Sequence, residues 1–176
     1  SYYVLYRMIR RGDQENSLHL AEYLGSFYHY ITRNADDEKH LSEEIEHAEN
    51  YARIQKYRFR DNLHVEIAKP DECIADVYVP RLILQPILEN AFKYVGGDYW
   101  IQIDARLEKG NRMTLEVRNS ILSNAVNNSK KGIGLENLQR QLELLYAGKH
   151  KLQYIKSNGT YVAHMEIELV KKTTIG

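Results

Sequence analysis

Cysteine is almost absent from the 176 residues of this chain, since Cys73 is the only one. A single thiol excludes an intrachain disulfide framework and a zinc site built from several cysteines, and it fits a reducing compartment. A surplus of charge of either sign is also missing, because 24 Lys and Arg residues balance 24 Asp and Glu residues. No global field therefore gathers a polyanion, which argues against broad binding of nucleic acid.

Long hydrophobic runs are missing too. The longest apolar stretch, near residues 79–92, is interrupted by Arg81, Gln85 and Glu89, so no segment is long and apolar enough to span a bilayer. The chain starts at Ser1, without an initiator Met and without a signal-like segment. We therefore expect a fragment of a longer protein that is soluble by itself.

Helical periodicity dominates the first 60 residues. Apolar residues from Leu20 to Ile31 recur at steps of three and four and form one stripe of a helix. Turn formers follow at 33–37, and Ser42 can cap a second helix whose heptad-like seam runs from Leu41 to Phe59. Two such helices cannot bury both stripes alone. They should therefore pair with each other, with the rest of the chain or with a second subunit.

The remaining residues alternate between strand and helix patterns. Helices are predicted over 86–95 and 135–146, and a loop rich in Ser, Asn and Lys over 120–131. Strands are predicted over 63–67, 73–79, 99–107, 113–117, 152–156 and 161–169. Hairpins mixed with helices in this order predict an α+β fold, a two-layer α/β sandwich preceded by an N-terminal helical hairpin, and not a doubly wound parallel sheet.

The helix that begins at Pro86 has one polar side. At 100° per residue, Glu89, Asn90, Lys93 and Tyr94 lie together on the side opposite the apolar residues. Asn90 can ligate a Mg²⁺ ion that also holds phosphate oxygens, Lys93 can neutralise a phosphate, and Glu89 can orient or deprotonate a nucleophile. The alternative is an ordinary i,i+4 surface pair of Glu89 and Lys93, worth about 0.2–0.5 kcal/mol.

A glycine-bearing loop leads straight into the next helix. Its residues are Lys130, Lys131, Gly132, Ile133, Gly134 and Leu135. Glycine lets a backbone approach a ligand closely, and the free N–H groups at the start of a helix favour an anion. The alternative is a flexible loop that simply ends at a helix cap. A polar helix face and a glycine-entered helix are together the parts that hold a nucleoside triphosphate with Mg²⁺.

Several stretches resemble one family. Residues 84–93, Leu-Gln-Pro-Ile-Leu-Glu-Asn-Ala-Phe-Lys, resemble the N-box of the GHKL (Bergerat-fold) ATPase domain found in sensor histidine kinases of the LytS/YesM type. Residues 132–137, with 142–146 after them, resemble that family's second glycine box and following helix. Residues 43–59 resemble the stretch that joins the dimerisation helices to the ATPase domain, and Gly159-Thr160 fits near the end.

The resemblance implies a protein-histidine kinase of two-component signal transduction. It implies a mixed sheet with helices on one face, a truncated dimerisation-type helical segment over residues 1–60, an ATP-binding catalytic domain over residues 61–172, and ATP and Mg²⁺ as cofactors. The γ-phosphate would pass to a histidine and then to an aspartate of a response regulator. The full-length protein would be a homodimer anchored in the inner membrane, with this chain as its cytoplasmic portion.

Site residues carry over one by one from the resemblance. Asn90 is the implied Mg²⁺ ligand, Glu89 the catalytic candidate beside it in the N-box, and Lys93 a phosphate contact. Asn119 stands where the family accepts the adenine amino group, and Thr160 supports the base pocket. The implied lid hinge and phosphate cradle comprise Lys131, Gly132, Gly134 and Leu135.

Four residues depart from the family's pattern. Asn119 replaces an Asp, so its hydrogen bond to adenine is no longer charge-assisted, and Ile121 adds bulk where the family has Gly. Tyr94 replaces a His, and Gln141 replaces an Arg. Asn119 and Ile121 support a second hypothesis, a degenerate signalling or dimerisation module with weak or no nucleotide binding. A non-kinase ATPase of the same fold is a third.

The phosphoacceptor is the largest departure. None of the seven histidines fits the family's Pro-His-Phe motif, which the resemblance places just before Ser1, and the seven form no metal-ligand pattern. We therefore expect a fragment that binds ATP and does not phosphorylate itself.

Overall fold

The computed structural model describes residues 1–32, 38–60, 62–68, 77–108, 111–122 and 132–169. The first half contains α1 (Tyr2–Arg10), α2 (Gln14–Thr32), β1 (Glu38–His40), α3 (Leu41–Phe59), β2 (His64–Ile67), β3 (Tyr78–Pro80) and α5 (Gln85–Tyr94). The second half contains β4 (Trp100–Glu108), β5 (Arg112–Ser120), α6 (Ile133–Leu145), β6 (His150–Ser157) and β7 (Thr160–Glu168). Part of the predicted strand 73–79, the turn at 109–110 and most of the loop 120–131 lie outside the described residues.

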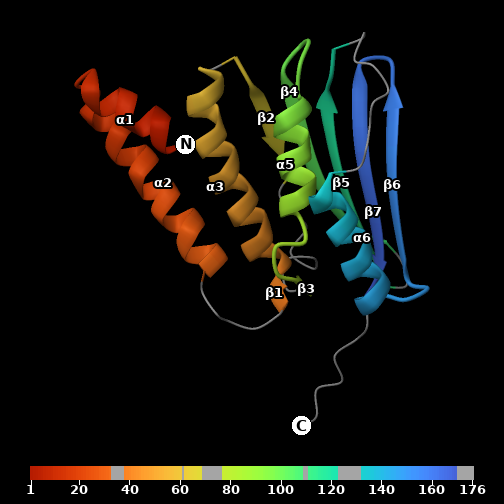
Figure 1. Cartoon of the computed structure of the whole chain (residues 1–176). Coiled ribbons are helices and arrows are strands. Elements are labelled where there is room, and N and C mark those ends of the chain that lie inside the picture. Colours follow the sequence, from red (N-terminus) through yellow and green to blue (C-terminus); the bar gives the residue numbers. More distant parts are fainter. Residues whose placement is uncertain (33–37, 61, 69–76, 109–110, 123–131, 170–176) are drawn as a thin grey trace.

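One sheet of five strands organises the fold, in the order β2-β4-β5-β7-β6. Strand β2 runs parallel to β4, and the other neighbours are antiparallel, so the sheet is mixed. Helices α3, α5 and α6 cover one face of it (Figure 1). The predicted two-layer α+β fold is confirmed. A separate pair of three-residue strands, β1 and β3, was not predicted as a pair.

Alternation along the strands explains why only one face of the sheet carries helices. In β4, Ile101, Ile103 and Ala105 are buried, whereas the residues between them are more exposed. The same alternation in β5 and β7 gives a single apolar face. Apolar residues of α5 and α6 pack against that face: Ile87, Leu88, Ala91, Phe92, Leu135, Leu138 and Leu142.

Helix α3 contributes to two hydrophobic clusters. Leu41, Ile45, Ala48 and Ala52 belong to the main core with the sheet, while Ile54 packs with Leu20 and Leu24 of α2. Most of the predicted α2 and α3 stripes is therefore buried between these helices and the sheet, whereas Tyr28 of the α2 stripe is exposed. Burying such an aliphatic side chain contributes roughly 1.5–3 kcal/mol, so α3 is bound firmly to the rest of the fold.

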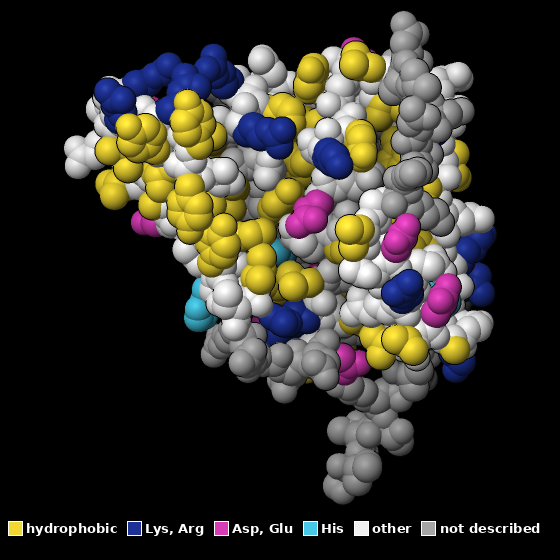
Figure 2. Space-filling model, viewed as in Figure 1, with side chains coloured by type: hydrophobic (Ala, Val, Ile, Leu, Met, Phe, Trp, Pro, Cys, Tyr) yellow, Lys and Arg dark blue, Asp and Glu magenta, His cyan; other side chains and the backbone are white. Residues whose placement is uncertain are grey.

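The N-terminal helices number three in the described residues, not the predicted two, because α1 precedes α2. Gly12, with φ +77°, forms the turn between them. No residue of α1 is buried, and its exposed apolar side chains are Tyr2, Tyr3, Tyr6 and Ile9. Figure 2 shows hydrophobic side chains gathered over this end of the molecule. None of the described helices has both the length and the apolar character that crossing a membrane requires.

Candidate functional site

Helix α5 carries its predicted polar side outward. Pro86 stands in its first turn, Glu89 and Lys93 are exposed, and Asn90 is half-buried. Within the described residues Glu89 and Lys93 do not form the surface ion pair that their spacing allows. Glu89 instead accepts a hydrogen bond from Gln85 Nε2 at 3.1 Å, and the Lys93 ammonium lies over the ring of Tyr94, 5.2 Å from its centroid.

Asn90 meets the sheet through Tyr161. Burial raises the pKa of the Tyr161 hydroxyl, and a hydrogen bond with Asn90 acts in the opposite direction. The Asn90 carboxamide therefore lies within hydrogen-bond reach of Tyr161.

Asn119 lies across from Tyr161 in the β5–β7 register and is fully buried, with 0% exposure. Its Nδ2 donates to the carbonyl oxygen of Ser120 at 3.0 Å, whereas its Oδ1 has no hydrogen-bond partner among the described atoms. An unsatisfied buried acceptor costs about 1–3 kcal/mol. A ligand that brings an N–H donor, as adenine does, would remove that cost, so the residue fits the implied nucleotide.

Ile121 closes one side of this region. Its N–H donates to the carbonyl oxygen of Gly159 at 2.8 Å, and its side chain is buried. Gly97 (φ +68°) approaches it so closely that an added Cβ would lie 3.3 Å from the Ile121 carbonyl oxygen. The bulky side chain predicted at residue 121 thus forms an apolar wall at the end of β5.

Helix α6 begins at the predicted glycines. Gly132 is its extended N-cap residue, with φ −67° and ψ 157°, and its carbonyl oxygen accepts from the N–H groups of Leu135 and Glu136. Gly134 is exposed, and a Cβ there would lie 3.7 Å from Pro86 Cβ, so the first turns of α6 and α5 are neighbours. Leu135 is buried and anchors α6 to the core. Lys131 lies outside the described residues.

Thr160 begins β7 and pairs with Ser120. Ala163, Met165 and Ile167 are buried in the core, so strand alternation places Tyr161 on the helix side and Thr160 on the opposite side. Tyr161 is therefore a site residue that the sequence analysis missed. The apolar residues that alternate along 161–167 were the sequence signal that could have identified it.

The structure thus gathers most of the predicted site residues between α5, the start of α6 and the ends of β5 and β7. Within the described part of the chain, no group of three or more His, Cys, Asp and Glu side chains could hold a metal ion. Mg²⁺ commonly needs only one or two protein oxygens, because substrate phosphates and water supply the rest. The donor set around Asn90 agrees with that kind of site and not with a metal bound by protein alone.

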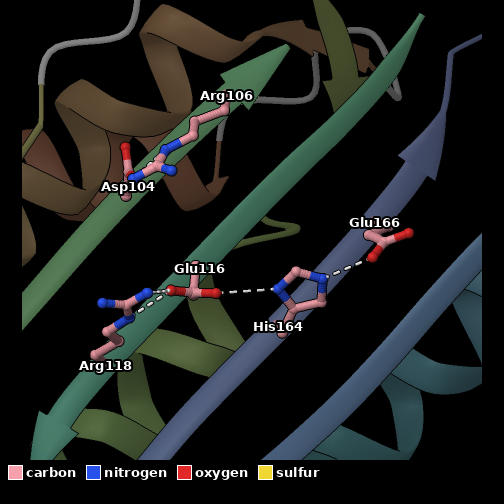
Figure 3. Close-up of polar contacts among 6 residues, drawn as sticks. All are labelled: Asp104, Arg106, Glu116, Arg118, His164 and Glu166. Carbon is pink, nitrogen blue, oxygen red and sulfur yellow. Dashed lines mark hydrogen bonds and ion pairs between the residues drawn. The ribbon is translucent and has the colours of Figure 1, made fainter. Parts of the chain in front are cut away.

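A second polar cluster lies on the opposite face of the sheet (Figure 3). His164 of β7 contacts Glu116 at 3.1 Å and Glu166 at 2.8 Å, and Arg118 pairs with Glu116. Burial acts to lower the pKa of His164, but the bonds to the two carboxylates outweigh it and leave this pKa raised. Beside them, Arg106 bonds Asp104 at 2.6 Å. The cluster joins neighbouring strands and lies away from α5 and α6.

Comparisons with known proteins agree on one kind of protein. A family model described as "Histidine kinase" matches residues 3–63. The sensor histidine kinase BtsS of Escherichia coli K12 is 33% identical over 141 residues, which cover 77% of this chain and 25% of that protein. The sensor histidine kinase YesM of Bacillus subtilis is 26% identical over 153 residues, covering 83% of this chain and 26% of that protein. The chain therefore spans about a quarter of these curated relatives.

Solved structures agree in fold. The Acinetobacter baumannii histidine kinase AdeS superposes with a TM-score of 0.58 at 15% identity, covering 89% of this chain and 80% of that one. The histidine kinase domain of the Erythrobacter litoralis EL346 blue-light activated kinase gives 0.56 at 17% identity, covering 88% and 75%.

Proposed function

The chain belongs to the sensor histidine kinases of the LytS/YesM type, and from that premise we propose that it is their ATP-binding catalytic part. Residues 61–172 would form the GHKL domain, and residues 1–60 the end of the dimerisation segment, although α3 shares the domain's core. Mg-ATP would bind between α5, the start of α6 and the ends of β5 and β7. In the full-length protein the γ-phosphate would pass to a histidine and then to a response regulator.

The observation that carries the proposal is the buried Asn119 Oδ1 without a partner, across the β5–β7 ladder from the tyrosine that bonds Asn90. A fully buried acceptor usually has a hydrogen-bond partner, which can be a ligand, an ion or an ordered water. In this site the acceptor Asn119 Oδ1 suits the adenine amino group, and the carboxamide oxygen of Asn90 suits a divalent cation.

Each residue then has a defined task. A hydrogen bond with Tyr161 holds the Asn90 amide, whose oxygen would serve as the ligand of the cation. Lys93 contributes positive charge toward phosphate oxygens, and Gly132 and Gly134 let the first N–H groups of α6 approach them. The exposed Glu89 orients or deprotonates the attacking group. Bound Mg-ATP supplies the transferable phosphoryl group and the charge that offsets the leaving phosphate.

The exposed apolar side of α1 supports dimerisation in the full-length protein. Four large apolar side chains on a nine-residue helix with no buried residue need a partner surface, and a second copy supplies one by symmetry. Attachment to the inner membrane, with this part in the cytoplasm, is proposed from the family alone.

A degenerate module is the second candidate function. Ile121 supports it, because its side chain and the strand link to Gly159 occupy space where the family keeps a glycine. In that case the fold would transmit signals through its helices without binding nucleotide.

Calorimetric titration separates the two candidates. A non-hydrolysable ATP analogue is titrated with and without Mg²⁺ into the wild type, Asn90→Ala, and the control Asn62→Ala, whose exposed side chain lies outside the site. The proposal predicts Mg²⁺-dependent binding that weakens in Asn90→Ala and is unchanged in Asn62→Ala. No binding at millimolar analogue would leave the degenerate module as the function to pursue.

A further inference from the structure

A chain of hydrogen bonds crosses from α3 to the polar side of α5. His47 Nε2 lies 3.0 Å from Gln85 Oε1, and Gln85 Nε2 lies 3.1 Å from Glu89 Oε1. His47 and Gln85 are buried, at 5% and 8% exposure, whereas Glu89 is exposed. This series of hydrogen bonds thus begins inside the protein and ends on Glu89, the side chain to which we assign the catalytic role.

The chemistry of the three groups sets the direction of this chain. An ionised carboxylate only accepts hydrogen bonds, so Gln85 must present its NH₂ group to Glu89 and its oxygen to His47. His47 must then carry a proton on Nε2. Burial lowers the pKa of His47, which favours the neutral ring, and the Gln85 oxygen beside Nε2 places the one ring proton on that nitrogen and leaves Nδ1 bare. A bare Nε2 would favour the flipped amide, which turns the Gln85 oxygen toward the Glu89 carboxylate.

Helix α2 holds the ring of His47 in place. The ring stacks on Phe27, with centroids 5.1 Å apart and planes at 15°, and on Tyr30, at 4.3 Å and 19°. Figure 1 shows α3 between α2 and α5. His47 of α3 therefore links helix α2 to helix α5. The direction of the Gln85 amide therefore depends on how α2 packs on α3.

A second connection joins α2 to the start of α5. The Tyr30 hydroxyl donates to the buried carboxylate of Glu44, which accepts from the N–H of Leu82 at 2.8 Å. Leu82 has φ +62°, a left-handed conformation that is strained for a leucine. These contacts hold the segment just before Gln85 against the same pair of helices.

Resting on the proposed role of Glu89, we propose that His47 is a positioning residue for the Glu89 carboxylate, acting through the Gln85 carboxamide and held by helix α2. A movement of α2 against α3 would then reach the catalytic side chain through a rotation of one amide. This assigns the N-terminal helices a direct structural influence on the N-box helix, beyond carrying the dimer contact.

Two substitutions separate hydrogen bonding from packing. His47→Phe keeps a flat ring between Phe27 and Tyr30 and removes the donor. His47→Gln supplies an NH₂ group in place of Nε2–H and removes the ring. Asn62→Ala is the control, because its exposed side chain lies outside this network.

The first readout is the Gln85 side-chain NH₂ group in NMR spectra of the isotopically labelled chain. Its hydrogen exchange should be about tenfold faster in His47→Phe, the loss of one hydrogen bond, and near the wild-type rate in His47→Gln and Asn62→Ala. Long-range ¹H–¹⁵N spectra of the wild type should show His47 protonated at Nε2. The Nδ1-protonated tautomer would overturn the proposal without any variant having to fold.

The second readout is autophosphorylation of the full-length protein. Because a misplaced catalytic group costs about 10- to 100-fold in rate, His47→Phe should lower kcat by that amount with the KM for ATP unchanged, and His47→Gln should stay near the wild type. The reverse order, with His47→Gln impaired and His47→Phe normal, would show that the ring only packs. A wild type that binds no ATP would sink the proposed function alone, and the NMR readout would still decide the positioning.

Discussion

Replacing Gly134 by alanine separates a role in ligand binding from a role in folding. Gly134 is the second residue of α6, is exposed, and has no positive φ. An added Cβ would meet Pro86 Cβ at 3.7 Å, which is ordinary van der Waals contact. The folded protein therefore has room for the methyl group.

The expected change in stability follows from helix propensity. Alanine in place of glycine at a compatible helical position stabilises by about 0.4–1 kcal/mol, chiefly by restricting the unfolded chain. For a chain of this length that corresponds to a rise in Tm of roughly 1–4 °C. A fall in Tm would contradict the geometry described for α6.

Nucleotide binding should change in the opposite direction. If phosphate oxygens lie on the first N–H groups of α6, the new methyl group obstructs the backbone just where the ligand approaches. We expect Kd for a non-hydrolysable Mg-ATP analogue to rise about tenfold, the equivalent of roughly 1.4 kcal/mol. The assay is calorimetric titration combined with a thermal melt. Gly148→Ala is not a suitable control, because the φ of +70° at Gly148 would strain an alanine. An unchanged Kd in a stabilised variant would refute Gly134 as part of the phosphate cradle.

Three further predictions concern buried or clustered polar groups. Tyr30→Phe leaves the Glu44 carboxylate without its hydroxyl donor and should lower the free energy of unfolding in urea by about 1.5–3 kcal/mol. Asn119→Asp should tighten analogue binding about tenfold through a charge-assisted bond and lower the stability of the ligand-free protein, because it buries a charge; unchanged values of both would contradict the adenine assignment. The pKa of His164 is raised in the folded protein, so its charged form stabilises the fold below pH 6.5, and this effect is lost as pH rises through the folded pKa. Its carboxylate partners have lowered pKa values, so their charged forms stabilise the fold above pH 4.5, and this effect is lost as pH falls. His164→Gln should therefore cost most between about pH 4.5 and 6.5, and a loss that stays constant to alkaline pH in urea titrations would exclude this linkage.

Local patterns were enough to predict the helices and strands around the site. Pro86 and the apolar stripe after it predict α5 to within one residue at each end, because a helix buries one side at a fixed period. The strands of the sheet were predicted from alternation for the same reason. Helix α1 was missed although Val4, Leu5 and Met8 recur at helical spacing and pack on the cluster of α2 and α3, because the segment is short and none of its residues is fully buried.

Contacts between distant segments could not be predicted in this way. The environment of His47 comes from α2, α3 and α5, and no spacing within one segment indicates that its ring stacks on Phe27 and bonds Gln85. The orphan oxygen of Asn119 is likewise a property of the folded sheet, although the residue itself was selected from the sequence. Whether Tyr161 or Thr160 faces the helices depends on the alternation of side chains along β7, and a shift of one residue would exchange the two.

An NMR titration of the labelled chain with Mg²⁺ and a non-hydrolysable ATP analogue would locate the nucleotide site. If Mg-ATP binds at the proposed site, saturable changes in backbone amide shifts gather at α5, at Gly132 to Leu135, and at the ends of β5 and β7 around Asn119 and Tyr161. Changes confined to the outer face around His164, or none at millimolar analogue, would contradict nucleotide binding between α5 and α6.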